Sequence, residues 1–142
     1  VSGALAALAD FERALPDAGG RAMRLKVSGA FHSPLMQGAA DHLADALAQE
    51  ELKEPMYPLY SNVTARPYGA DDARELLARQ VVSPVRWEET VRGMADAGVD
   101  RFLELGPGNV LCGLIGRIVP DARCARADTP EALQEAVMSL GA

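Results

Sequence analysis

The feature that most restricts the fold is a short apolar strand that turns directly into a helix. Residues 101–105 form the strand, Gly106-Pro107-Gly108 follows without a spacer, and apolar side chains then recur with helical spacing through residues 110–118. A strand, a tight turn and a helix in succession are the building unit of α/β domains. The sequence therefore predicts an α/β fold, with Asn109 as the cap of this helix.

The other elements are predicted from apolar periodicity and from capping residues. Helices are expected over residues 4–15, 34–50, 71–80, 84–97 and 130–140, and strands over residues 22–28, 57–63 and 123–127. Asp71 or Asp72 is expected to cap the third of these helices, and Ser83-Pro84 to open the fourth. With 142 residues, 49% hydrophobic and 24% charged, the chain is expected to form one compact domain or part of one.

Charge and cysteine content exclude several classes of protein. The net charge is −6, whereas binding to nucleic-acid phosphates depends on clustered Lys and Arg, so no nucleic-acid partner is expected. No apolar run approaches the roughly 20 residues that cross a bilayer, so no membrane partner is expected either. Cys112 and Cys124 form neither a CxxC motif nor a Cys/His cluster. This predicts reduced thiols in a cytoplasmic protein, with Cys112 as a small core residue and no metal site.

The stretch Val27–Met36 carries the histidine of greatest interest. A strand-like run ends there, Ser33 has the properties of an N-cap, and Pro34 suits the first helical position. His32 is therefore expected between two ordered elements, which suits a general base because the imidazole is held in place. The structural alternative, in which the ring packs beside Phe31 or bonds a loop carbonyl, remains open at this point.

Four phrases of the sequence resemble one enzyme family. They are Val27-Ser28-Gly29-Ala30-Phe31-His32-Ser33-Pro34-Leu35-Met36, Tyr60-Ser61-Asn62-Val63-Thr64, Arg79-Gln80-Val81-Val82-Ser83-Pro84-Val85-Arg86-Trp87 and Glu104-Leu105-Gly106-Pro107-Gly108-Asn109-Val110-Leu111. Their order and spacing resemble those of malonyl-CoA:acyl carrier protein transacylases and the related acyltransferase domains of polyketide synthases. The resemblance implies that residues 1–28 end a small ferredoxin-like subdomain and that residues 29–142 are the C-terminal part of a hydrolase-like layered α/β core.

This resemblance implies an activity and its residues. The family moves a malonyl group from malonyl-CoA to the phosphopantetheine thiol of acyl carrier protein through an acyl-serine, without a metal or redox cofactor. On this basis His32 is the catalytic base, and the backbone carbonyl of Gln80 accepts the hydrogen bond that orients its ring. Phe31 is expected to favour malonyl over methylmalonyl, and Asn62 to supply supporting hydrogen bonds behind the histidine.

The chain departs from the family by lacking the nucleophile. None of its six serines lies in a GxSxG elbow, and the family's oxyanion-hole glutamine and carboxylate-binding arginine would also lie upstream of Val1. The resemblance therefore covers roughly the C-terminal half, the missing N-terminal half is an expected partner, and the chain alone is expected to be inactive. The alternatives are a non-catalytic remnant or scaffold module that binds carrier protein, and an unrelated α/β domain in which His32 is structural.

Three further candidates have simpler interpretations. Gly106-Pro107-Gly108 precedes a helix, but its spacing matches neither phosphate-binding glycine motif, so a tight turn is the favoured interpretation. Glu104 ends a strand and is expected to cap neighbouring amides instead of acting in catalysis. His42 falls inside a predicted helix without metal-ligand neighbours and is expected at the surface.

Overall fold

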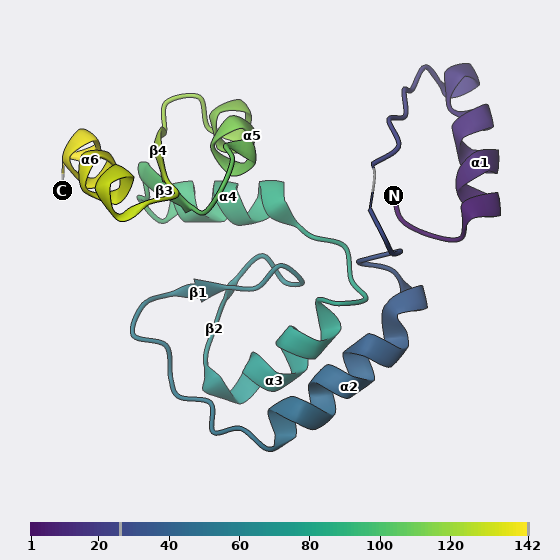
Figure 1. Cartoon of the computed structure of the whole chain (residues 1–142), viewed down its shortest axis with the longest axis horizontal. Helices are drawn as coiled ribbons and strands as arrows, with labels where there is room; N and C mark the ends of the chain where they lie inside the picture. Colours follow the sequence, from purple (N-terminus) through teal and green to yellow (C-terminus); the bar gives the residue numbers. More distant parts are fainter. Residues whose placement is uncertain (26, 142) are drawn as a thin grey trace. The chain divides into compact units, whose positions relative to one another are not determined.

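The computed structural model describes residues 1–25 and 27–141. The chain divides into two compact units, residues 1–86 and residues 87–142. Both contain helices and short strands, so the α/β prediction is confirmed at this level (Figure 1). Within the described residues no helix is both long enough and apolar enough to span a bilayer.

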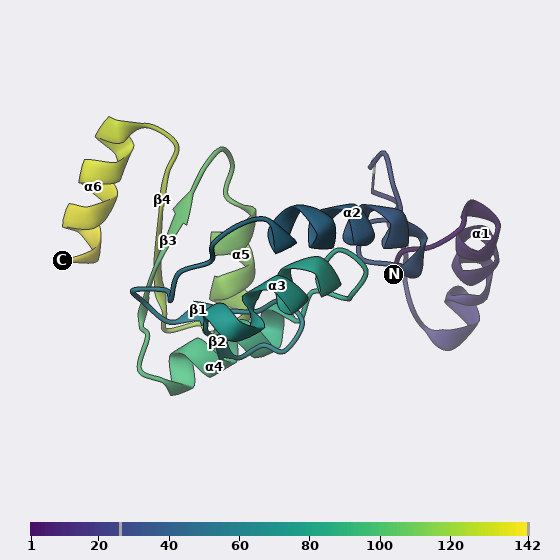
Figure 2. The ribbon, with the colours of Figure 1, turned by 90° about the horizontal axis from the view of Figure 1, so that it is seen from below.

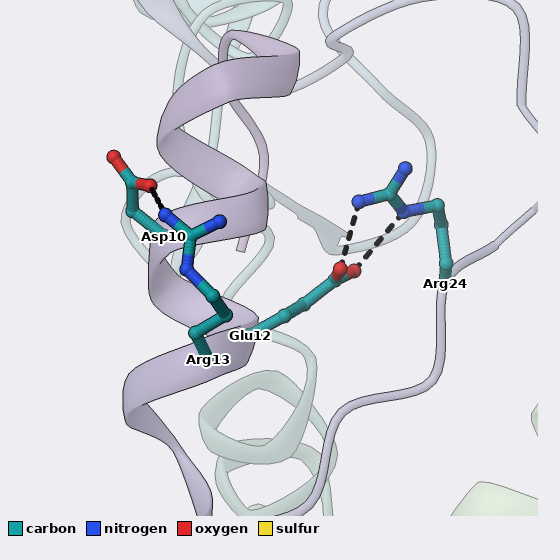
Figure 3. A network of polar contacts seen from close by, with 4 residues as sticks. All are labelled: Asp10, Glu12, Arg13 and Arg24. Atoms are coloured by element: carbon teal, nitrogen blue, oxygen red, sulfur yellow. Dashed lines mark hydrogen bonds and ion pairs between the residues drawn. The ribbon is translucent and has the colours of Figure 1, made fainter.

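The first unit begins with helix α1 (Leu5–Ala14), close to its predicted bounds. The single turn Pro16–Ala18 follows and ends at Gly19, whose φ of 72° is readily adopted by a residue without a Cβ. Surface ion pairs lie on this helix: Arg13 pairs with Asp10, and Glu12 reaches Arg24 at 2.7 Å (Figure 3). Helix α1 therefore ends within one residue of the bound predicted from the sequence.

The strand predicted at residues 22–28 is wrong for the part that is described. Residues 21–25 and 27–28 form no strand, and Lys26 lies outside the described residues. The alternating side chains Met23, Leu25 and Val27 are 85%, 71% and 63% exposed. Alternation predicts a strand only if another strand is available to share its backbone hydrogen bonds, and none pairs with the described residues of this segment.

Two helices and a short hairpin make up the rest of this unit. Helix α2 (Gln37–Ala48) follows one 3₁₀ turn, Pro34–Met36, so the predicted helix starts at Pro34 as 3₁₀ and becomes α-helical at Gln37. It packs against α3 (Ala70–Arg79), with which it lies side by side in Figure 1. Strand β1 (Leu59–Tyr60) pairs antiparallel with β2 (Pro67–Tyr68), so the strand expected over residues 57–63 is shorter than predicted.

The cap of α3 differs from the prediction. Gly69 occupies the N-cap position, and Asp71 and Asp72 lie inside the first turn. The Ala70 N–H instead donates to Glu54 Oε2 at 2.8 Å. A carboxylate from a loop sixteen residues away thus replaces the local cap, which sequence spacing alone does not reveal.

The second unit contains α4 (Trp87–Asp96), β3 (Arg101–Leu105), α5 (Val110–Ile118), β4 (Arg123–Ala127) and α6 (Pro130–Leu140). The two strands are parallel and joined through α5, and α5 and α6 lie on opposite sides of them (Figures 1 and 2). A parallel pair needs such a crossover helix to reverse the chain direction. The buried apolar residues of this unit are Val91, Ile115, Ala127, Ala136 and Leu140.

Two expectations for this unit are wrong. Helix α4 begins at Trp87 and not at Pro84, because the Ser83 N–H donates to the Gln80 carbonyl and so continues the turn that ends α3. Cys112 and Cys124, expected as reduced thiols, form a disulfide. Helix α5 packs against β4, the strand that follows it. This packing brings the Cα atoms of Cys112 and Cys124 to 5.5 Å, within the range of a disulfide. Cys112 is also only partly buried.

Candidate active site

His32 lies in a tight turn between Ala30 and Ser33. Its φ of 59° is left-handed, a conformation that is uncommon for residues with a Cβ and is often found at functional sites. Its backbone N–H donates to the Val81 carbonyl at 3.1 Å. The side chain is exposed, so the ring is held at the surface of this unit and not enclosed by it.

The histidine ring contacts the backbone carbonyl of Gln80. Nδ1 lies 2.9 Å from that oxygen, which is forty-eight residues along the chain. A carbonyl oxygen only accepts hydrogen bonds, so the contact requires a proton on Nδ1. In the neutral ring the lone pair is then on Nε2, the nitrogen that points away from this bond. This tautomer leaves Nε2 able to accept a proton.

The two carbonyls that hold His32 come from the end of helix α3. Gln80 is the C-cap of α3 and Val81 follows it, so neither carbonyl is used by the hydrogen bonds within the helix, although the Gln80 carbonyl also accepts from the Ser83 N–H. The C-terminal end of a helix also carries partial negative charge. A positive charge that forms on the ring during proton transfer is therefore opposite a negative end, the arrangement that an aspartate provides in other catalytic sites.

Asn62 connects this site to the loop after β1. Its Nδ2 donates to Gln80 Oε1 at 3.3 Å, and its own carbonyl accepts from the Arg86 N–H at 3.0 Å. Arg86 Nη1 also donates to the Thr64 carbonyl at 3.2 Å. Buried Ser61 accepts from the next amides of the same loop. Gln80 is thus held through its side chain while its carbonyl contacts the histidine.

Phe31 precedes the histidine and is 47% exposed. A Cβ placed on Gly29 would lie 3.6 Å from the Phe31 ring, so the ring rests against that glycine. A residue with this exposure is not a buried core side chain of this unit.

No protein-family model matches the chain, but individual relatives do. Malonyl CoA-acyl carrier protein transacylases from Bacillus subtilis (strain 168) and Escherichia coli (strain K12) are 38% and 40% identical over 84% and 82% of the chain. A crystal structure of MCAT from Streptococcus pneumoniae matches 97% of the chain with a TM-score of 0.90 and 36% identity. A malonyl-transacylase in complex with a type II PKS acyl-carrier protein matches 96%, also at 0.90, with 38% identity.

The chain belongs to the malonyl CoA-acyl carrier protein transacylase family. It spans 38% of the length of the two bacterial relatives and 46% of the pneumococcal structure, and in the relatives it corresponds to the C-terminal part. The polyketide biosynthesis protein ThaF of Burkholderia thailandensis is 44% identical over 68% of the chain, which covers 8% of that protein. The sequence resemblance to this family is thereby confirmed.

Glu104 of this transacylase-family chain caps helix α5. Its carboxylate accepts from the Cys112 N–H at 2.9 Å and the Leu111 N–H at 3.0 Å. Both bonds lower the pKa of Glu104 below its ordinary value, and the bond from Cys112 contributes more than the bond from Leu111. The charge of Arg126 makes a smaller contribution in the same direction. The capping interpretation is confirmed, whereas Asn109 makes no side-chain cap bond. Because the carboxylate occupies these amides, the turn before α5 does not offer them to a phosphate.

Two more expectations concern histidine and metals. His42 lies exposed on α2, as predicted. Among the described residues of this transacylase-family chain, no group of three or more His, Cys, Asp or Glu side chains is arranged to hold a metal ion. Sequence reasoning missed the Val81 carbonyl and Arg86, and no local pattern marks either of them, because their hydrogen bonds join distant segments. The Val81 carbonyl accepts from the His32 N–H, and Arg86 donates to the carbonyls of Asn62 and Thr64.

Proposed function

We propose that this chain is the histidine-bearing part of an enzyme that transfers a malonyl group from malonyl-CoA to the phosphopantetheine thiol of acyl carrier protein. The observation that carries the proposal is the 2.9 Å contact between His32 Nδ1 and the Gln80 carbonyl, which leaves Nε2 free to take a proton. Membership of the transacylase family supplies the reaction. The serine nucleophile would come from the part of the relatives that this chain does not cover.

In the proposed first half-reaction, His32 Nε2 removes the serine hydroxyl proton while the serine oxygen attacks the malonyl thioester carbonyl. The tetrahedral intermediate then expels the coenzyme A thiolate, which takes the proton from the imidazolium. In the second half-reaction the ring deprotonates the phosphopantetheine thiol, the sulfur attacks the acyl-serine, and the proton returns to the serine oxygen. Only protons and one acyl group move, so the proposed reaction calls for no metal or redox cofactor.

Gln80 and Asn62 have supporting roles in this proposal. The Gln80 carbonyl keeps the proton on Nδ1 and orients the ring, and the Asn62 amide holds the Gln80 side chain at 3.3 Å. Because the first role belongs to the backbone, replacing the Gln80 side chain should reduce activity much less than replacing His32.

The proposed partners are acyl carrier protein and the rest of the enzyme. The likeness to a malonyl-transacylase solved with an acyl-carrier protein supports the first. The exposed apolar side chains of residues 23, 25 and 27 support the second, because such surface is normally covered. We further propose that residues 1–28 end a ferredoxin-like subdomain and that residues 29–142 belong to a hydrolase-like layered core.

The experiment is carried out on the complete polypeptide that contains this chain, with malonyl transfer to carrier protein as the readout. His32→Ala should lower kcat by about 10²–10⁴, the usual contribution of a general base. His42→Ala is the matched control, because this second histidine is exposed on α2. Unchanged turnover in His32→Ala would reject the proposal and favour a non-catalytic module. The 142-residue chain alone should show no transfer, because it has no elbow serine.

Acyl selection is a separate part of the proposal. We infer that Phe31 favours malonyl over methylmalonyl, because a rigid ring beside the base occupies the space of an α-methyl group. Discrimination by one methyl group corresponds to roughly 10–200-fold. Competition between the two coenzyme A esters should show that Phe31→Ser reduces the ratio of their kcat/KM values. An unchanged ratio, with both rates measurable, would show that Phe31 does not select the acyl group.

A further inference from the structure

The backbone of the His32 turn is closed by a side chain. Ser33 Oγ donates to the Ala30 carbonyl at 2.7 Å and accepts from the Leu35 N–H at 3.3 Å. Among the described residues, no backbone hydrogen bond joins the Ser33 N–H to the Ala30 carbonyl. The hydroxyl therefore takes the place of the backbone bond that ordinarily closes a four-residue turn.

This turn includes a backbone conformation that needs support. His32 has a Cβ and a φ of 59°, which is unfavourable for such a residue unless surrounding bonds hold it. Its amide and its ring both reach across to the end of α3, at 3.1 and 2.9 Å. Both bonds are made while His32 has this φ. The hydrogen bond from Ser33 Oγ to the Ala30 carbonyl joins the two ends of the turn that contains His32.

The Ser33 hydroxyl is well placed to hold the turn and poorly placed to act as a nucleophile. Its residue is 5% exposed, whereas Phe31 beside the histidine is 47% exposed. A shielded hydrogen bond competes with little water, so its loss leaves the Ala30 carbonyl without this partner. The hydroxyl already donates its hydrogen bond to that carbonyl and accepts one from the Leu35 N–H, so Ser33 is not available as a substitute nucleophile.

We propose that Ser33 is a positioning residue, whose hydroxyl holds His32 in its left-handed conformation so that Nδ1 stays on the Gln80 carbonyl and Nε2 is presented for proton transfer. The catalytic consequence rests on the function proposed above. The effect on the ring does not, because it concerns only hydrogen bonds within residues 30–81 of this chain.

The effect on the ring is measured by nitrogen NMR of the two histidines in the 142-residue chain, at one fixed, mildly alkaline pH for every variant. In the wild type the His32 signals should show the proton on Nδ1, while exposed His42 supplies the reference for an unconstrained ring. In Ser33→Ala the His32 signals should move toward those of His42. Ser139→Ala is the matched control, since Ser139 Oγ also donates to the carbonyl three residues earlier, at 2.8 Å.

Two conservative variants separate the hydroxyl from general packing. Ser33 has φ −137° and ψ 163°, an extended backbone that a β-branched residue adopts readily, so Ser33→Thr should retain the His32 signals. Ser33→Cys keeps the size but has only a weak donor, so it should behave like Ser33→Ala. It also provides the measurement if Ser33→Ala does not fold. Wild-type His32 signals in Ser33→Cys, or in folded Ser33→Ala, would overturn the proposal.

Kinetics of the complete enzyme test the catalytic consequence. Ser33→Cys should lower kcat by about 10-fold to 10²-fold through misplacement of the base, with little change in KM, and Ser33→Thr should restore it. If the NMR signals shift but kcat does not change, the positioning of the ring stands and its catalytic role fails. If His32→Ala is itself fully active, the proposed function fails and the NMR result is unaffected.

Discussion

His32 and Glu104 both lie a few residues before a helix, but different contacts hold them. The ring of His32 is fixed by a carbonyl forty-eight residues away, whereas Glu104 binds amides only seven and eight residues ahead. The disulfide between Cys112 and Cys124 also links α5, the helix that Glu104 caps, to β4. One site therefore depends on the packing of helices distant in sequence, and the other forms largely within one supersecondary unit.

The two turns also reach positive φ by different means. Gly106 and Gly108 have φ values of 122° and 101°, at which residues with side chains are strained. His32 has φ 59° and carries a side chain, so hydrogen bonds must hold it there. Glycine adopts the positive φ of the turn near Glu104 with little strain. The turn at His32 has the same kind of conformation at a residue with a side chain, so it is strained.

The largest expected effect tests the dependence of His32 on distant packing. Leu76 is 8% exposed on α3, the helix whose end holds the histidine. Leu76→Ala should lower the free energy of unfolding by about 2–5 kcal/mol and move the His32 nitrogen signals toward those of His42. Exposed Glu75→Ala, which removes only the surface pair with Arg79, should do neither. Unchanged His32 signals in a destabilised Leu76→Ala chain would contradict the comparison.

The disulfide provides a second test, in the region around Glu104. Cys112 and Cys124 are twelve residues apart, and closing a loop of about 15 residues is worth about 3 kcal/mol. The double variant Cys112→Ser/Cys124→Ser should lose about this much stability in denaturant unfolding. Hydrogen exchange should show the loss at the amides of β4 and α5. If a reductant changes neither the unfolding free energy of the wild type nor its hydrogen-exchange pattern, the disulfide does not stabilise this unit.

Gly106→Ala tests how the two turns obtain their conformations. No atom lies within 4 Å of a Cβ placed there, so the change probes backbone conformation alone. At φ 122° it should cost roughly 1–3 kcal/mol in thermal or denaturant unfolding. Gly3→Ala is the control, because a Cβ there also meets open space and its φ is not positive. Equal stability of the two variants would show that this turn does not depend on glycine.

The smallest expected effect is the pH dependence contributed by Glu104. Hydrogen bonds from Cys112 and Leu111 lower the pKa of this carboxyl in the folded chain. Its contribution to stability is therefore present above the ordinary glutamate pKa of about 4.3 and is lost as the pH falls through the lower folded value. Unfolding curves at successive acidic pH values should fall more steeply for the wild type than for Glu104→Gln. Parallel curves would mean that the cap bonds do not favour the charged form.

Much of the second unit follows from local sequence. The bounds predicted for β3, α5, β4 and α6 agree with the structure. Thr129 Oγ1 accepts from the Ala132 N–H at 3.1 Å, and Gly141 ends α6 with φ 73°, so residues next to this helix set both of its ends. Apolar periodicity, side-chain caps and glycine conformations act over only a few residues, so a sequence read in short windows contains them.

The four ordered phrases were likewise sufficient to recognise the family and to select His32 and Gln80 as site residues. The distance between them was not available from the phrases, because it depends on how α3 ends beside the turn at Ala30–Ser33. The roles assigned to His32, Gln80, Phe31 and Asn62 stay predictions until the variants above are measured.

Tertiary structure decided the features that need a partner distant in sequence. The alternating residues 22–28 lack a neighbouring strand, Glu54 replaces a local cap on α3, and the crossover of α5 joins two cysteines expected to be free. The left-handed turn at His32 belongs to the same group, since the bonds that hold its amide and ring come from the end of another helix. Hydrogen bonds, strand pairs and disulfides each require two groups to meet, and one segment of sequence specifies only one of them.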